Sequence, residues 1–166
     1  GSLTECLDKY RKIKRSAFSE EIVPYLMRQI MDAMKYLHKK KIIHRDLKLD
    51  NILVNFPTEE DKHSVNMLKS QVKIIDFGFA THINAGTLAK STLGSPINMD
   101  PKILDKMNRG RGKLAYDEKA DIWSLGTVCY EMLIGKATFE ATEMDELADK
   151  LPVLIFFKPL QFKTNP

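Results

Sequence analysis

The sequence predicts an α+β fold that is mostly helical and includes one short two-stranded element. Apolar residues recur at helical spacing along 3–14 and again along 22–40, so each segment is expected to form a helix with one buried face. A third helix is expected over 120–134, where apolar residues occur on nearly every side, as in a helix within a core. Two short apolar runs, 51–54 and 72–75, have the composition of strands.

Length and composition limit the class of protein. The chain has 166 residues and 43% apolar content, which suits a single domain with a core of ordinary size. Its 26 Lys and Arg against 22 Asp and Glu give a net charge of +4, spread along the chain. This mild basic excess favours a solvated surface over a nucleic-acid-binding patch.

The cysteines and the apolar runs bear on location. Cys6 and Cys129 show no metal-type spacing with histidines, so reduced thiols and a cytoplasmic location are expected. The chain opens without a basic-then-apolar leader, and no run approaches 18 apolar residues. Neither secretion nor a membrane span is expected.

Residues 18–24 carry the signals of a helix start. Ser19 is of a type that caps helix N-termini, and the two glutamates after it suit the positive end of a helix dipole. Phe18 can pack against Val23 as a hydrophobic staple, and Pro24 is tolerated in a first turn. We therefore expect Ser19 to be the N-cap of the second helix.

Residues 44–51, with the sequence HRDLKLDN, concentrate charged and amide side chains just before an apolar strand. Twenty-five positions past Asn51, the second apolar run ends in Asp76, and Phe77 and Gly78 follow. An Asp and an Asn on facing strand ends can share a hard cation. Magnesium takes a few such oxygen ligands and completes its shell with water and substrate phosphates. The pattern therefore favours phosphoryl transfer.

The match is specific enough to indicate a family. Six fixed residues within 44–51, at roughly one in twenty each, would coincide by chance on the order of 10⁻⁸ times per starting position. With the Asp-Phe-Gly triplet at 76–78, the sequence resembles the eukaryotic protein kinases of serine/threonine type. The resemblance implies a protein kinase-like fold over 1–147: the mostly helical large lobe, truncated before its last helices, with the small lobe absent. Residues 148–166 are expected to be a divergent tail.

The resemblance also implies an activity and its residues. The reaction would transfer the γ-phosphoryl group of ATP to a serine or threonine of a protein substrate. Asp46 would accept the proton of the substrate hydroxyl, and Lys48 would offset charge on the transferring phosphate. Lys48 also favours serine and threonine, because tyrosine-specific relatives usually place other residues there. The implied cofactor contacts are Lys48, Asn51, Leu53, Ile75 and Asp76, of which Asn51 and Asp76 would hold Mg²⁺ and Leu53 and Ile75 would line the adenine.

A further implied contact lies in the third helix. Asp121, Trp123, Ser124 and Gly126 have the spacing of the buried central helix of the kinase large lobe. There Asp121 would accept backbone hydrogen bonds from the catalytic loop and hold Asp46 in place. The alternative is that Asp121 simply caps the start of a buried helix, which many helices do.

Three features depart from the family pattern or concern regulation. Kinases usually join the two strands by a tight turn, so the polar stretch 56–71 is expected to be a surface loop, with a docking element as the alternative. Lys102 stands where a glutamate normally pairs with a distant arginine, and a lysine would repel that arginine. Arg45 implies an anionic partner, expected to be a phosphate on Ser91 or Thr92.

Two rival classes remain open from the sequence. The 166 residues contain no glycine-rich phosphate loop and no strand lysine with its glutamate partner, so the chain by itself is expected to be inactive. That absence, with Lys102, favours a pseudokinase fragment that binds other proteins. The presence of Asp46, Lys48, Asn51 and Asp76 favours a partial chain of a complete kinase. The expected partners are a protein substrate and ATP, without nucleic acid; the sequence does not predict the oligomeric state.

Overall fold

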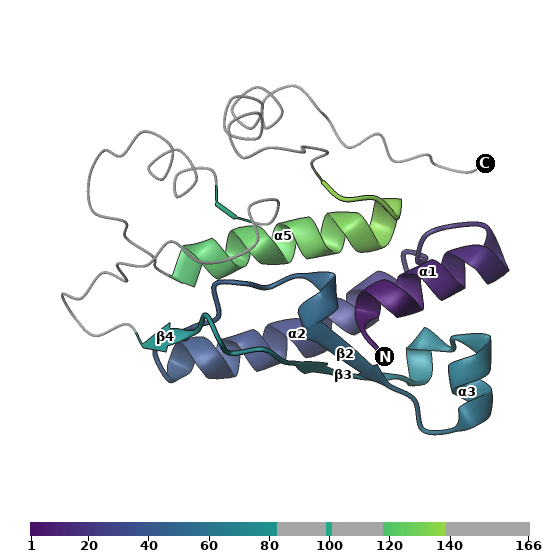
Figure 1. Ribbon diagram of the computed structural model, residues 1–166, viewed down its shortest axis with the longest axis horizontal. Coiled ribbons are helices and arrows are strands. Elements are labelled where there is room, and N and C mark those ends of the chain that lie inside the picture. The colour runs from purple at the N-terminus through teal and green to yellow at the C-terminus, as the bar shows by residue number, and fades with distance from the viewer. Residues whose placement is uncertain (83–98, 101–117, 139–166) are drawn as a thin grey trace.

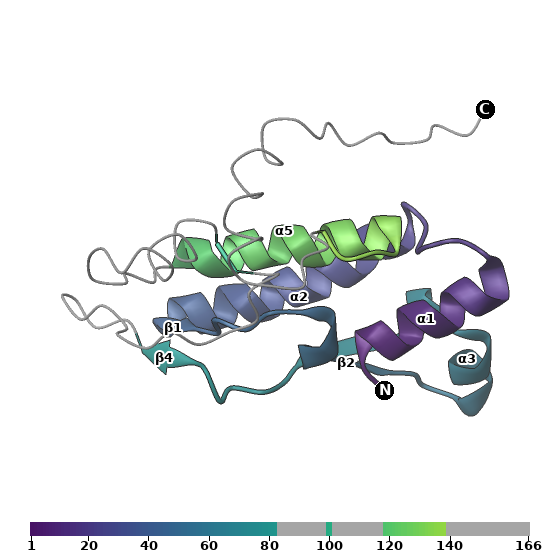
Figure 2. The same cartoon turned by 45° about the horizontal axis from the view of Figure 1, so that its top comes forward.

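The computed structural model describes residues 1–82, 99–100 and 118–138. These residues form three long helices, one short helix and two small sheets (Figure 1). The long helices are α1 (Leu3–Lys14), α2 (Ile22–Lys39) and α5 (Glu118–Ile134). Helix α2 contacts both α5 and the sheet formed by β2 and β3, so it lies at the centre of the fold (Figure 2). The α+β class and its helical majority are confirmed.

Both sheets are two-stranded and antiparallel. Strand β2 (Ile52–Asn55) pairs with β3 (Gln71–Ile74), with Ile52 opposite Ile74. The strand expected at 51–54 therefore starts one residue later, because a 3₁₀ turn occupies 49–51. The strand expected at 72–75 starts and ends one residue earlier. A second sheet, between β1 (Ile42–Ile43) and β4 (Thr81–His82), was not expected, since two-residue strands carry no period that a sequence reveals.

Helix α1 is held to β2 and to the segment before it. A reciprocal capping box starts the helix: the Glu5 N–H donates to Ser2 Oγ at 3.2 Å, and the Ser2 N–H donates to Glu5 Oε2 at 3.0 Å. The Val54 N–H donates to the Gly1 carbonyl at 2.8 Å. The Thr4 hydroxyl donates to Asp50 at 2.9 Å. These contacts fix α1 against the residues that precede β2.

Helix α2 begins later than expected. Ser19 makes two hydrogen bonds typical of a cap: its Oγ accepts from the Ile22 N–H at 3.4 Å, and its carbonyl accepts from the Val23 N–H at 3.1 Å. The regular helix nevertheless starts at Ile22, so the residue at the N-cap position is Glu21, whose side chain makes no cap. Pro24 explains the difference. With Ser19 as N-cap, the nitrogen of Pro24 would have to donate to the backbone of residue 20, and proline has no N–H. A start at Ile22 instead puts Pro24 in the first turn, where no donor is needed.

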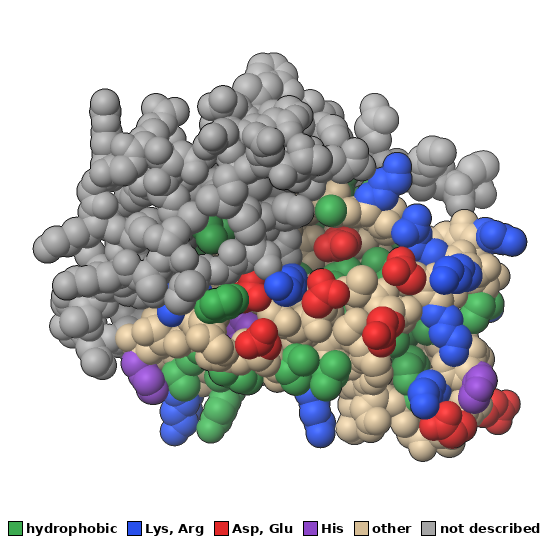
Figure 3. Space-filling view, in the orientation of Figure 1, with side chains coloured by type: hydrophobic (Ala, Val, Ile, Leu, Met, Phe, Trp, Pro, Cys, Tyr) green, Lys and Arg blue, Asp and Glu red, His purple; other side chains and the backbone are tan. Residues whose placement is uncertain are grey.

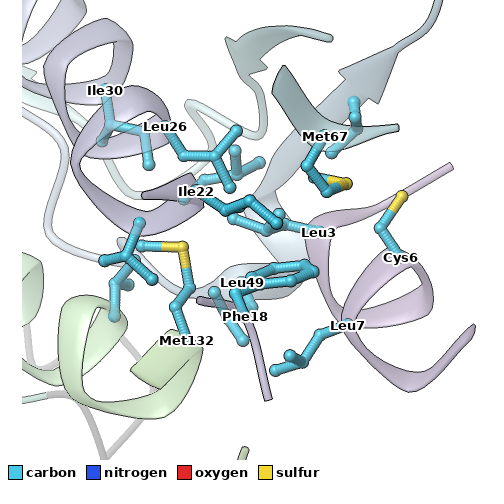
Figure 4. Packing of buried hydrophobic residues seen from close by; sticks show 14 of the residues in the cluster. Leu3, Cys6, Leu7, Phe18, Ile22, Leu26, Ile30, Leu49, Met67 and Met132 are labelled. Atoms are coloured by element: carbon cyan, nitrogen blue, oxygen red, sulfur yellow. The ribbon is translucent and has the colours of Figure 1, made fainter. Parts of the chain in front are cut away.

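One apolar core joins α1, α2, α5 and the segment around β2. Figure 4 shows Leu3 and Leu7 from α1, Ile22 and Leu26 from α2, and Met132 from α5 converging on it. Phe18 lies in the same cluster and packs edge-on against Tyr10, with ring centroids 5.0 Å apart. The periodic apolar faces read from the sequence are therefore the faces that the fold buries.

The expectation that 56–71 is a surface loop is wrong. The segment contains helix α3 (Glu59–Ser64) and a 3₁₀ turn (Met67–Lys69). Val65 and Met67 are 2% and 1% exposed and belong to the core. The Thr58 hydroxyl caps α3 and donates to Asp61, which lowers the pKa of that carboxyl. The sequence did not predict the burial of Val65 and Met67, because two apolar residues among polar ones form no periodic pattern.

Helix α5 ends as the sequence indicates. Gly135 has φ = +75°, and its N–H donates to the Glu131 carbonyl at 2.8 Å, which closes the last turn. Within the described ranges, no helix combines the length and apolarity that crossing a membrane requires.

Candidate active site

The site is built on the segment that links β1 to β2. Ile43 at the end of β1 is completely buried, and so is Leu47, the fourth residue of the following loop. These two apolar side chains anchor the loop in the protein. Between them, His44 and Asp46 are 0% and 3% exposed, so their polar groups must find partners inside the protein.

Asp46 finds two of those partners within its own loop. Lys48 Nζ lies 3.0 Å from Asp46 Oδ2, and Asn51 Nδ2 donates to the same oxygen at 2.9 Å. Asn51 Nδ2 also donates to the Asp46 carbonyl at 2.8 Å. The Lys48 side chain is 29% exposed, whereas that of Asp46 is only 1% exposed. A cation reachable from solvent therefore offsets a buried carboxylate, and the Asn51 amide fixes its orientation.

The loop backbone is held by helix α5. Asp121, which is completely buried, accepts hydrogen bonds from the His44 N–H at 3.0 Å and from the Arg45 N–H at 2.9 Å. The expected backbone hydrogen bonds from this loop to Asp121 are confirmed. One carboxylate thus satisfies two consecutive backbone donors, and it restrains the peptides immediately before Asp46.

Sequence reasoning missed His38. Its Nε2 lies 2.8 Å from Asp121 Oδ2, so α2 contributes a further contact to the same carboxylate. In the sequence His38 is one polar residue near the end of an amphipathic helix, next to a lysine run. Only the packing of α2 against α5 brings it to Asp121, so no sequence signal singled it out.

Asp76 is joined to the loop through the sheet. The Ile75 N–H donates to the Asn51 carbonyl at 2.9 Å, which extends the β2–β3 ladder to the residue before Asp76. His44 Nε2 lies 3.0 Å from the Ile75 carbonyl. Asp76 has φ = +61°, and its Oδ1 accepts a hydrogen bond from the Gly78 N–H at 3.1 Å. The backbone turns sharply here and leaves the Asp76 side chain exposed.

The donor set of Asn51 and Asp76 fits a hard divalent cation. The side-chain nitrogen of Asn51 donates to Asp46, so the side-chain oxygen of Asn51 is the atom that could bind a cation. Asp76 offers an exposed carboxylate with one oxygen already oriented by Gly78. Two oxygen donors from the protein, with the remaining positions left to water and phosphate, match what Mg²⁺ prefers. In the described residues, no cluster of three or more His, Cys, Asp or Glu offers a metal site.

Leu53 and Ile75 share one face of the sheet. Leu53 pairs with Lys73 in the register, and Ile75 is two residues further along, so strand alternation puts all three on the same side. Leu53 is 38% exposed, whereas its neighbours Ile52 and Val54 are buried. Next to Asn51 and Asp76, this face therefore carries an exposed leucine and a partly exposed isoleucine, with Lys73 between them.

Phe77 is a second residue whose contact the sequence did not predict. Its ring packs edge-on against His44, with centroids 5.2 Å apart and planes at 69°. The Arg45 side chain donates to the Phe79 carbonyl, so both histidine and arginine of the loop contact the segment after Asp76. The two halves of the site are therefore connected by side chains as well as by the sheet.

Several expectations concern residues outside the described ranges. They are the regulatory phosphate on Ser91 or Thr92, the repulsion expected from Lys102, and the divergent tail at 148–166.

The protein kinase domain family model matches residues 1–163. Human serine/threonine-protein kinase ULK1 is 38% identical over 147 residues, which is 89% of this chain and 13% of ULK1. Serine/threonine-protein kinase atg1 of Neosartorya fischeri is 36% identical over 165 residues, covering 89% of this chain and 17% of atg1.

A nematode relative shows the same level of similarity. Serine/threonine-protein kinase unc-51 of Caenorhabditis elegans is 36% identical over 135 residues, covering 81% of this chain and 15% of unc-51. The chain thus spans less than a fifth of the length of these three relatives.

Proposed function

Because the chain belongs to the protein kinase domain family, we propose that it carries the catalytic loop of a serine/threonine protein kinase. The proposed reaction transfers the γ-phosphoryl group of ATP to the hydroxyl of a serine or threonine in a protein substrate. The family resemblance read from residues 44–51 and 76–78 is confirmed by the match over 1–163. The roles of individual residues are part of the proposal.

Asp46 is proposed to accept the proton of the attacking hydroxyl. The hydroxyl oxygen bonds to the γ-phosphorus, the bond from that phosphorus to the bridging oxygen breaks, and ADP leaves. The proton passes to Asp46, whose carboxylate is held by Asn51 at 2.9 Å. Lys48 lies on the same carboxylate and is partly exposed, so it is positioned to offset negative charge on the transferring phosphate as well.

The nucleotide is proposed to lie on the exposed face of β2 and β3. Leu53 and Ile75 would contact the adenine from one side, since they share that face. Asn51 and Asp76 would hold Mg²⁺ through their side-chain oxygens. An ion held there would offset the negative charge of the phosphates.

The observation that carries the proposal is the shared oxygen of Asp46. Lys48 Nζ and Asn51 Nδ2 both contact Asp46 Oδ2, within a loop whose backbone donates hydrogen bonds to Asp121. A buried aspartate with only a structural role needs hydrogen-bond partners, but it does not need a lysine that reaches solvent. The arrangement suits a base that must take up a proton beside an anionic substrate.

The experiment compares phosphate transfer by the full-length protein and its Asp46→Asn variant. We expect kcat to fall by about 10²–10⁴-fold, as for a lost general base, with little change in the KM for ATP. Asp50→Asn is the matched control, because Asp50 is an exposed carboxylate four positions away whose side chain accepts a hydrogen bond from Thr4 of α1. Unchanged turnover in Asp46→Asn would rule out the assigned role.

The same assay separates the proposal from the pseudokinase alternative. A wild-type full-length protein that binds partners but transfers no phosphate would overturn the proposed activity and support a binding module. The 166-residue chain assayed by itself is expected to be inactive, because it contains no glycine-rich loop or strand lysine for the phosphates. A cytoplasmic location stays a prediction.

A further inference from the structure

A cavity unrelated to the candidate active site lies between the end of α1 and the end of α5. Its volume is about 540 Å³, and it shares no lining residue with the candidate active site. Three cations line it, Arg11, Lys12 and Arg15, together with the Asp8 carboxylate and the Ser16 hydroxyl. Apolar side chains from the following loop and from α5 complete the wall.

Two left-handed residues shape this cavity. Arg15, with φ = +58°, ends α1, and its N–H donates to the Arg11 carbonyl at 2.9 Å. On the facing side, Gly135 at the end of α5 has φ = +75°. A Cβ placed on Gly135 would lie 3.1 Å from Arg11 Nε and 3.3 Å from Ala17 Cβ. The missing side chain therefore lets Arg11 and the loop approach the end of α5 closely.

The charges of the cavity are only weakly neutralised by its own carboxylate. Arg11 lies 3.7 Å from Asp8, and the two side chains are 45% and 59% exposed. An exposed pair at this distance contributes little to stability and is easily exchanged for a stronger anion. Lys and Arg side chains gather over α1 on the right of the face drawn in Figure 3. The cations of the last turn of α1 also interact favourably with the helix dipole. Arg15 lies beyond that turn, as does Ser16, so the dipole does not account for the cation at position 15.

We propose that Ser16 is a phosphorylation site whose phosphate is bound in this cavity by Arg11, Lys12 and Arg15. Ser16 is exposed and lies outside any helix or strand, so an acting kinase can reach it. Four cations, at positions 11, 12, 14 and 15, precede it, and an acidic substrate cleft can bind such a sequence. This proposal does not rest on the function proposed above.

In the proposed modification, a separate kinase binds ATP, which donates the phosphoryl group. Ser16 Oγ forms a bond to the γ-phosphorus, the bond to the β–γ bridging oxygen breaks, ADP leaves, and the hydroxyl proton passes to the base of that kinase. The new group carries about −1.5 to −2 charges and three acceptor oxygens. Guanidinium groups bind such oxygens with two parallel donors. The phosphate would therefore link the end of α1, the loop and the end of α5.

The first test asks whether Ser16 is modified. The full-length protein is treated with ATP and a kinase selective for basic sequences, and the phosphorylated residues are mapped by mass spectrometry. We expect phosphate at Ser16 in the wild type and none there in Ser16→Ala. Ser64→Ala is the matched control, because Ser64 is exposed but follows acidic residues, and phosphate at Ser16 should persist in it. Phosphate found elsewhere in the wild type but absent from Ser16 would overturn the proposal.

The second test asks whether the cavity binds the phosphate. Phosphoserine is inserted at position 16 during translation, so recognition by a kinase plays no part. We expect the thermal midpoint to rise by roughly 2–4 °C relative to serine. In an Arg11→Gln, Arg15→Gln background that rise should disappear. An equal rise in both backgrounds, or no rise in the wild type, would refute binding by these cations.

Discussion

The carboxylate of Asp121 accepts a hydrogen bond of 2.9 Å from the backbone N–H of Arg45, a residue 76 positions earlier in the chain. The same carboxylate takes the His44 N–H and contacts the His38 ring. A buried carboxylate at the start of α5 therefore holds the loop that carries Asp46. The geometry of the candidate active site depends on this contact between two distant segments.

Asp121→Ala should destabilise the fold strongly. The change leaves two buried backbone donors and His38 without their shared acceptor, and removing one partner from such an arrangement costs about 3–5 kcal/mol. Urea unfolding followed by circular dichroism measures the loss. Asp32→Ala, an exposed position on α2, is the control and should change the free energy of unfolding by less than about 0.5 kcal/mol. Equal effects in both variants would contradict the anchoring role.

Asp76→Asn should weaken the use of magnesium by the full-length protein. The substitution removes the negative charge that is proposed to hold the cation, while an amide oxygen can still accept from Gly78. The Mg²⁺ concentration at half-maximal phosphate transfer should rise at least about tenfold, which is the scale of a disturbed metal ligand. Asp32→Asn serves as the control. An unchanged magnesium dependence would remove Asp76 from the proposed metal site.

Met67→Ala tests the finding that 56–71 contributes to the core. Met67 is 1% exposed, and truncating a buried methionine costs about 2–5 kcal/mol in unfolding free energy. The adjacent Leu68 is 38% exposed, so Leu68→Ala should cost far less. Denaturant unfolding of the two variants compares neighbouring residues with different burial. If they were equally mild, the segment would be a surface loop after all.

Replacing Gly126, within α5, and Gly135, just after it, by alanine should change the stability of the protein in opposite directions. Gly135 has φ = +75° and close neighbours, so Gly135→Ala should cost about 1–2 kcal/mol in stability. Gly126 lies within the helix, and a Cβ there would meet no atom within 4 Å in the part of the chain that the structure describes. Gly126→Ala should therefore stabilise by about 0.5–1 kcal/mol. Thermal unfolding of both variants gives the signs, and a gain for Gly135→Ala would refute the strain argument.

Glu131 should make stability depend on pH. Burial raises the pKa of the Glu131 carboxyl, and nearby Asp50 and Asp8 raise it further, above the ordinary value of 4.5. The folded state therefore favours the protonated form, and stability is lost as pH rises from that value through the raised pKa. Glu131→Gln should be more stable than the wild type at about pH 7, and the difference should vanish near pH 4. Urea unfolding at both pH values checks this, and a gain that persists at low pH would show another cause.

Local sequence was sufficient for the buried faces of α1 and α2 and for the family. The period of apolar residues predicts the buried faces of α1 and α2, because each face depends only on spacing along one helix. The expected bounds of 3–14 match α1, and Gly135 ends α5 as expected. The residues of 44–51 and 76–78 indicated the family for the same reason, since their types and spacing are contained in the chain itself.

The tertiary structure decided which of those residues meet. The start of α2 was decided by backbone hydrogen bonding, because Pro24 has no N–H to donate, and not by the preference of Ser19 for the N-cap position. Burial of Met67, the pairing of β1 with β4, and the approach of His38 to Asp121 each join segments far apart in sequence. Such contacts depend on which elements pack against each other, and the identity of the partner element leaves no period or motif in the sequence. The sequence by itself therefore determined which chemical groups the protein carries, and the fold determined which of them share a partner.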